Sequence, residues 1–135
     1  MNAPVPDATE PQIAELVRRF YHSARADGEL GPLFEAAIGD WDGHLRTVAD
    51  FWSHVLLGTR RYQGSPYQAH THLPLQPAHF ERWLALFRQA AGETLPPAAA
   101  ERVIARAEHM AESFKAGLFA FPGRKGPLLA HPVKP

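Results

Sequence analysis

Apolar residues recur at helical spacing along most of the sequence, and no segment shows the strict alternation that is typical of a strand. The first apolar stripe follows Thr9 and Gln12, which suit a capping box, and it consists of Ile13, Leu16, Val17, Phe20, Tyr21 and Ala24. The last and broadest stripe consists of Val103, Ile104, Ala107, Met110, Ala111, Phe114 and Leu118. The pattern predicts an all-α protein.

Capping residues and glycines predict where the second and third helices end. Residues 30–39 indicate a short helix, with Gly39 as a left-handed stop. Asp40 suits the N-cap of a third helix over residues 41–57, and Gly58 lies where that helix should end. Two consecutive helices are therefore expected, with a very short connection between them.

Prolines predict the starts of the last two helices. Pro77 opens a long helix that is expected to end before Gly92. Thr94, Pro96 and Pro97 are expected to start a final helix that runs to about Phe121. Residues 59–74 are rich in glycine and proline and show neither period, so we expect a loop with at most one short helix near residues 67–72.

The length and the composition indicate one folded domain. A chain of 135 residues with 45% hydrophobic content can bury one core but leaves no room for a second domain. The composition changes abruptly to proline and glycine after Phe121. We therefore predict a flexible segment over 1–10, a helical domain over 11–121 and a flexible tail over 122–135.

Charge and cysteine content exclude several classes of function. The 14 basic residues balance the 14 acidic ones, which argues against nucleic acid or a membrane surface as a partner. The absence of cysteine excludes disulfides, thiolate metal ligands, a thiol nucleophile and the covalent attachment of c-type haem. Because no stretch approaches about 20 apolar residues, we expect a soluble cytoplasmic protein rather than a membrane protein.

Three polar side chains fall on apolar helix faces. On a helical wheel His44 lies within about 40° of Val48 and Phe51, inside the predicted buried stripe. Tyr21 lies at the edge of the first stripe, and Trp83 lies on the apolar face of the fourth helix. A core histidine bonded to a backbone carbonyl is the commoner case, and each aromatic alone is more often plain core. Together they suggest a polar ligand enclosed by helices.

Three further histidines cluster around the irregular segment. Any of His70, His72 and His79 could offer a ring nitrogen to a metal, and the spacing alone does not choose among them. A zinc site formed by these three is one alternative, although catalytic zinc usually adds a carboxylate or a closely fixed third ligand. A haem-free helical interaction module, whose histidines merely pack, is the other.

Several short motifs follow one another in a characteristic order. The first half of the chain contains Phe20-Tyr21, Leu30-Gly31-Pro32-Leu33-Phe34, His44, Phe51-Trp52 and Leu56-Leu57-Gly58. The second half contains Tyr62-Gln63-Gly64-Ser65-Pro66, His70, Leu73-Pro74 and the run from Phe80 to Phe87. In this order the motifs resemble the third group of truncated haemoglobins, and the match covers residues 13–121. The resemblance implies a shortened globin, in which two antiparallel helix pairs cross over a haem.

The resemblance also implies roles for individual residues. His70 matches the proximal iron ligand, Phe34 the ring that packs on the haem face, and Tyr21, His44 and Trp83 the distal side chains. Further expected contacts of haem b are Val48, Phe51, Trp52, Tyr62, Leu73 and Phe80. Partners for the haem propionates are expected among the residues near the loop, namely Arg46, Arg60, Arg61 and Tyr62.

The function implied by the resemblance is reversible binding of dioxygen and other diatomic ligands at haem iron. Several distal donors favour chemistry on dioxygen, nitric oxide or peroxide over bulk transport, because each donor slows the release of a polarised ligand. An enzymatic version, either nitric oxide dioxygenation or peroxide reduction, would need an unidentified reductant, and the sequence carries no reductase domain. We expect a monomer that also binds carbon monoxide.

Overall fold

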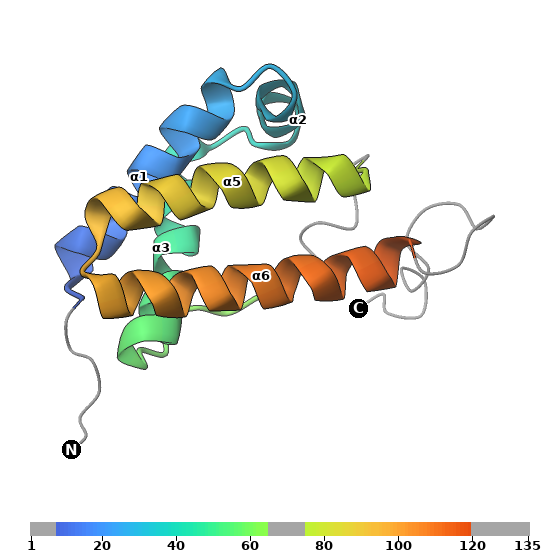
Figure 1. The fold of residues 1–135 in the computed structure, drawn as a ribbon. Coiled ribbons are helices and arrows are strands. Elements are labelled where there is room, and N and C mark those ends of the chain that lie inside the picture. Colours follow the sequence, from blue (N-terminus) through green and yellow to red (C-terminus); the bar gives the residue numbers. More distant parts are fainter. Residues whose placement is uncertain (1–7, 65–74, 120–135) are drawn as a thin grey trace.

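The computed structural model describes residues 8–64 and 75–119. Within these ranges the chain forms α1 (Glu10–Ala26), α2 (Leu30–Ala37), α3 (Trp41–Leu57), α5 (Pro77–Thr94) and α6 (Pro97–Phe119) (Figure 1). These described ranges contain no strand, so the predicted all-α class is confirmed. The predicted short helix near residues 67–72 and the two predicted flexible ends lie outside the described residues, except that residues 8–10 are described and α1 begins at Glu10.

Local side-chain chemistry explains where three of the predicted boundaries fall. The Thr9 hydroxyl accepts a hydrogen bond from the Gln12 N–H at 3.2 Å. In turn, the Gln12 side-chain oxygen accepts a hydrogen bond from the Thr9 N–H at 3.0 Å. The Asp40 carboxylate accepts from the Gly43 N–H at 3.0 Å and so begins α3. Gly58 ends α3 with a φ of 76°, a conformation that a side chain would strain.

Two predicted helix ends were wrong. Gly39 is not a left-handed stop, because α2 already ends at Ala37 and the chain leaves it through an extended Ile38. Gly92 does not end α5, which continues to Thr94, so Thr94 closes α5 instead of starting the last helix. A helical glycine costs only about 1 kcal/mol, and burial of Leu95, which follows Gly92 at the end of α5, favours continuing the helix past it.

The helices pack as two crossing groups. In Figure 1, α5 and α6 run side by side, α1 and α2 lie above them, and α3 passes behind. Contacts join α1 to α2, α3 and α5, and join α6 to α3 and α5. The core lies where α1, α3, α5 and α6 meet. None of the helices in the described part of the chain is both long and apolar enough to cross a bilayer.

Stacked aromatic rings occupy the centre of this core. Phe87, which is 2% exposed, stacks on Trp83 at 5.6 Å between ring centroids and on Trp52 at 5.0 Å. Phe20 of α1 meets Phe87 edge-on at 5.8 Å. These contacts join α1, α3 and α5 through large rings, which add directional interactions to the burial of apolar surface.

Candidate functional site

An apolar cleft lies between α2, α5 and α6. It encloses about 480 Å³, counting the part that is open to solvent. Among its lining side chains only those of His79 and Trp83 carry N–H groups. The cleft is lined by Leu30, Leu33, Phe34, Leu75, His79, Phe80, Trp83, Met110, Ala111 and Phe114. A largely apolar cavity with few polar groups is typical of a site for a large hydrophobic ligand.

Tyr21 and His44 form a hydrogen-bonded pair beside this cleft. The Tyr21 hydroxyl and His44 Nε2 lie 3.0 Å apart, and either can donate, depending on the histidine tautomer. Tyr21 is 8% exposed. His44 is half-buried, which is less burial than its place on the helical wheel predicted. Burial raises the pKa of the Tyr21 hydroxyl well above its ordinary value. This hydroxyl therefore stays protonated at neutral pH and can act as a donor.

Trp83 connects the pair to the cleft. A smaller pocket of about 250 Å³ lies on the inner side of Tyr21 and is lined by Val17, Phe20, Tyr21, Val48, Trp52, Trp83 and Phe87. Because Trp83 lines both this inner pocket and the apolar cleft, the two cavities share a wall. The sequence had placed these donor side chains on separate apolar faces, and the fold brings all of them to one region.

The other predicted contact residues divide between the two cavities and the core. Phe34 and Phe80 line the cleft, and Phe34 also meets Tyr21 edge-on at 5.4 Å. Val48 and Trp52 line the inner pocket. Phe51 packs on Trp52 at 4.9 Å and on the half-buried Tyr62 at 5.2 Å, so it supports the inner pocket from behind. His70, His72 and Leu73 lie outside the described residues.

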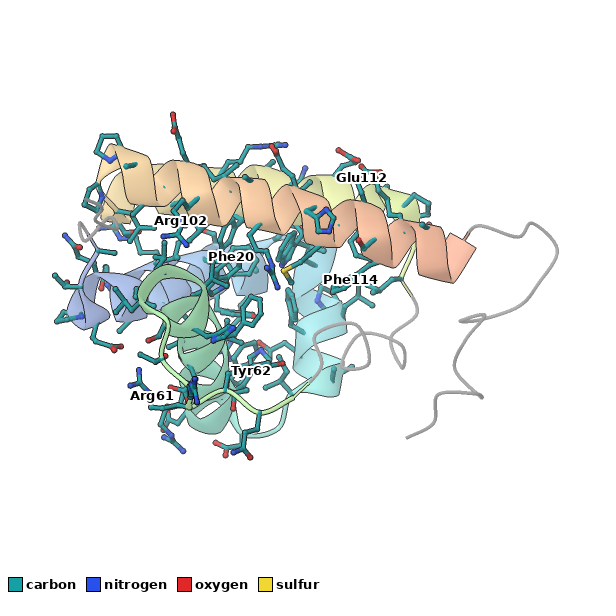
Figure 2. The ribbon with its side chains drawn as sticks, turned by 90° about the horizontal axis from the view of Figure 1, so that it is seen from below. Phe20, Arg61, Tyr62, Arg102, Glu112 and Phe114 are labelled. Carbon is teal, nitrogen blue, oxygen red and sulfur yellow. The ribbon has the colours of Figure 1, made fainter. Side chains whose placement is uncertain are left out.

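The predicted propionate partners occupy different settings. Figure 2 shows Arg61 beside α3 and well apart from Phe114, which lines the cleft. The Arg61 guanidinium binds Glu10 at 2.9 Å and Asp50 at 3.1 Å, so it ties the start of α1 to α3. A propionate would have to displace both carboxylates from Arg61. Arg46 is exposed on α3 and forms no ion pair within residues 8–64 and 75–119.

His79 has a local role that sequence reasoning missed. Its Nδ1 accepts the Gln76 N–H at 2.9 Å and so caps α5, while the ring lines the cleft. No group of three histidines, cysteines or carboxylates capable of holding a metal occurs in the described part of the chain. The zinc site predicted as an alternative includes His70 and His72, which lie outside that part, and it therefore stays a prediction.

Two lining residues of α6 and one residue of α3 were also missed as site residues. Met110 and Phe114 had been assigned only to the broad apolar stripe of the last helix, whose width was a usable signal of a second packing surface. Trp41 meets Tyr21 at 5.7 Å and His44 at 5.9 Å between ring centroids. As the first residue of its helix, Trp41 carried no periodic signal.

Comparisons with known proteins agree with this arrangement. The sequence profile of the bacterial-like globin family matches residues 8–116. A group 3 truncated hemoglobin from Campylobacter jejuni is 34% identical over 119 residues, which cover 84% of this chain and 94% of that relative. The matched region contains all the described helices except the last residues of α6.

Solved structures give the same result. The crystal structure of group III truncated hemoglobin from Campylobacter jejuni superposes with a TM-score of 0.82 at 31% identity, covering 90% of this chain and 100% of that one. The group II 2-on-2 hemoglobin from the plant pathogen Agrobacterium tumefaciens has a TM-score of 0.67 at 22% identity, covering 84% and 97% respectively, and supports the fold alone. The chain therefore belongs to the bacterial-like globin family, as a truncated haemoglobin of the third group.

Proposed function

We propose that this globin holds haem b in the cleft between α2, α5 and α6, and that diatomic ligands bind in the inner pocket beside Tyr21 and His44. The residues present fit such a group. Phe34, Phe80 and Phe114 provide apolar surface for a porphyrin face, and Met110 offers an adaptable thioether side chain. With no cysteine in the chain, the haem would be held without covalent attachment.

The proposed iron ligand is His70, on the resemblance of its sequence context to the proximal segment of the family. Haem, when bound, supplies an iron that coordinates dioxygen, nitric oxide or carbon monoxide and that can exchange electrons. Arg46 is the better candidate for a haem propionate, because its guanidinium projects from α3 without a carboxylate partner in the described ranges.

The observation that carries the functional proposal is that Tyr21, which is hydrogen-bonded to His44, lines the same inner pocket as Trp83. These side chains can donate to a ligand that gains negative character, and the pocket around them is otherwise apolar. A charge-assisted bond stabilises its acceptor by about 1.5–3 kcal/mol, which corresponds to about 10–150-fold in affinity. Such retention favours chemistry on dioxygen, nitric oxide or peroxide over bulk transport.

The absorption spectrum of the reduced protein, before and after carbon monoxide, tests haem binding. We expect a Soret band that shifts when carbon monoxide is added, and we expect His70→Ala to lose stable haem. His72→Ala is the matched control, because it removes a neighbouring histidine of the same segment. Stoichiometric zinc with no Soret band after haem addition would refute the proposal in favour of the zinc alternative. A wild-type ferrous spectrum in His70→Ala would refute the ligand assignment alone.

A steady-state assay of nitric oxide consumption separates a reversible binding protein from an enzyme. With dioxygen and a supplied reductant, a dioxygenase consumes nitric oxide over many turnovers, whereas a binding protein consumes one equivalent per haem. We expect turnover, since hydrogen-bond donors at the inner pocket favour retention of dioxygen until nitric oxide arrives. Consumption that stops at one equivalent would exclude the dioxygenase version. The reductant, a monomeric state and a cytoplasmic location stay predictions.

A further inference from the structure

Trp41 is packed directly against the Tyr21–His44 pair. Its ring meets Tyr21 at an interplanar angle of 65° and His44 at 87°, so it is in edge contact with both partners of the hydrogen bond. The indole Nε1 of Trp41 is buried and has no hydrogen-bond partner among the described residues. Ring contacts rather than a hydrogen bond therefore hold this side chain in place.

Arg25 covers the Trp41 ring. Its guanidinium carbon lies 4.0 Å from the ring centroid, which is well within the range of a cation–π contact. The Arg25 Nε in turn donates to Glu35 of α2 at 2.8 Å. Side chains from three helices thus form a stack in the order Glu35, Arg25, Trp41, and the stack rests on the Tyr21–His44 hydrogen bond.

This stack lies between the solvent and the inner pocket. An open groove of about 790 Å³ runs along the outside of α1 and α3, and Arg25 and Trp41 are among its lining residues, with Arg18, Tyr21, His22, Ala26 and Leu45. Tyr21 lines the inner pocket as well. The Tyr21 side chain therefore separates the groove from the pocket, and Trp41 supports it on the outer side.

We propose that Trp41 is a positioning residue, which Arg25 and Glu35 hold against the Tyr21–His44 pair, and that this stack slows the passage of diatomic ligands between the outer groove and the inner pocket. The inference rests on the proposed function, since it needs a ligand that binds in the inner pocket. Loosening the stack frees Trp41 to move, so the Tyr21–His44 bond opens more often and ligands pass faster.

The magnitude follows from the contact that is lost. Arg25 and Glu35 are about half exposed, with side-chain exposures of 43% and 50%, so their ion pair contributes little by itself. The cation–π contact is the larger component, and an exposed contact of this kind corresponds to a change of about two- to fivefold in an equilibrium. We expect carbon monoxide association with Arg25→Ala to be faster by about this factor.

Flash photolysis of the reduced, haem-loaded protein with carbon monoxide tests the inference. The matched control is Arg18→Ala, because Arg18 lines the same groove and has an exposed ion pair with Glu15 but lies over no ring in the described structure. Glu35→Gln leaves the guanidinium in place and should give a smaller increase than Arg25→Ala. Trp41→Phe keeps a ring and should stay within about twofold of the wild-type rate, whereas Trp41→Ala should be the fastest variant.

Thermal unfolding of the same variants separates positioning from general stability. Arg25→Ala and Arg18→Ala each lose one exposed ion pair, and Arg25→Ala also loses the cation–π contact. We therefore expect a small fall in melting temperature for both variants, somewhat larger for Arg25→Ala. Of these two variants, only Arg25→Ala should change the carbon monoxide rate and the C–O stretching frequency, which reports on the polar groups around the ligand.

The outcomes also distinguish this inference from the proposed function. A normal Soret band with wild-type association rates in both Arg25→Ala and Trp41→Ala overturns the positioning role and leaves the proposed function intact. Equal acceleration by Arg18→Ala also overturns it, because the effect would then come from the charge of the groove. A wild-type protein that gives no Soret band overturns the proposed function, and this inference with it.

Discussion

Replacing Tyr21 with phenylalanine removes one hydroxyl from the inner pocket and keeps the ring. The edge contacts of that ring, for example with Phe20 at 4.8 Å, should survive the change. The hydroxyl makes a 3.0 Å hydrogen bond with His44, and a neutral intramolecular bond contributes about 0.5–1.5 kcal/mol. Because His44 is half-buried, water can partly replace the lost partner. We expect the free energy of unfolding to fall by about 1 kcal/mol, or roughly 3–6 °C in melting temperature.

The effect on dioxygen release depends on which atom of the pair carries the proton. If His44 Nε2 is protonated, it donates to the Tyr21 oxygen, and the Tyr21 proton is then available to the ligand. Loss of the Tyr21 hydroxyl should in that case speed dioxygen dissociation by about 10–150-fold. If Nε2 is unprotonated, Tyr21 must give up the bond to His44 in order to donate to the ligand. Tyr21 then stabilises the bound ligand by only about 1 kcal/mol, and its loss should speed dioxygen dissociation by about fivefold. The size of the change therefore reports the tautomer.

Stopped-flow displacement of dioxygen by carbon monoxide, on the reduced haem-loaded protein, measures this rate. Ser53→Ala is a suitable control, since Ser53 is fully buried on α3 and its hydroxyl lies 2.8 Å from that of Thr59. It should lower stability to a similar extent and leave the dissociation rate unchanged. A Tyr21→Phe rate within twofold of the wild type would show that this hydroxyl does not donate to the ligand, and the reasoning would fail.

Four further predictions concern the fold. Asp40→Ala removes the cap of α3 and should lower the unfolding free energy by about 1 kcal/mol in urea titration, and an unchanged midpoint would contradict the capping role. Gly58→Ala places a side chain at a φ of 76° and should cost about 1–2 kcal/mol by the same measurement; a gain in stability would show that α3 can end differently. Phe87→Ala leaves a cavity between aromatic rings and should cost about 3–5 kcal/mol, so circular dichroism that shows an unaltered melting temperature would disprove its central place. Because burial raises the pKa of Tyr21, the unfolded chain releases this proton first as the pH rises above about 10, and stability should fall there; Tyr21→Phe should flatten the profile, and a profile identical to the wild type would count against the shift.

The ends of the helices were predictable where they depend on neighbouring residues alone. Thr9, Asp40 and Gly58 act through a single hydrogen bond or one backbone conformation, and both are properties of a few consecutive residues. Gly39 and Gly92 carried the same local signal and were misread. At Gly92 the burial of Leu95, one turn further on, favours a helix that continues through the glycine, and burial depends on helices distant in the sequence.

The candidate site also has features that the sequence alone could indicate and features that only helix packing decided. The sequence by itself made Tyr21, His44 and Trp83 candidates, because a polar group on an apolar helix face is visible in the spacing, and the order of motifs identified the family. That Tyr21 and His44 meet in one hydrogen bond was decided by the way α1 crosses α3, and so was the ion pair of Arg61 with Glu10. Side-chain partners across helices depend on where each helix lies in space, and spacing along the chain carries no record of that placement.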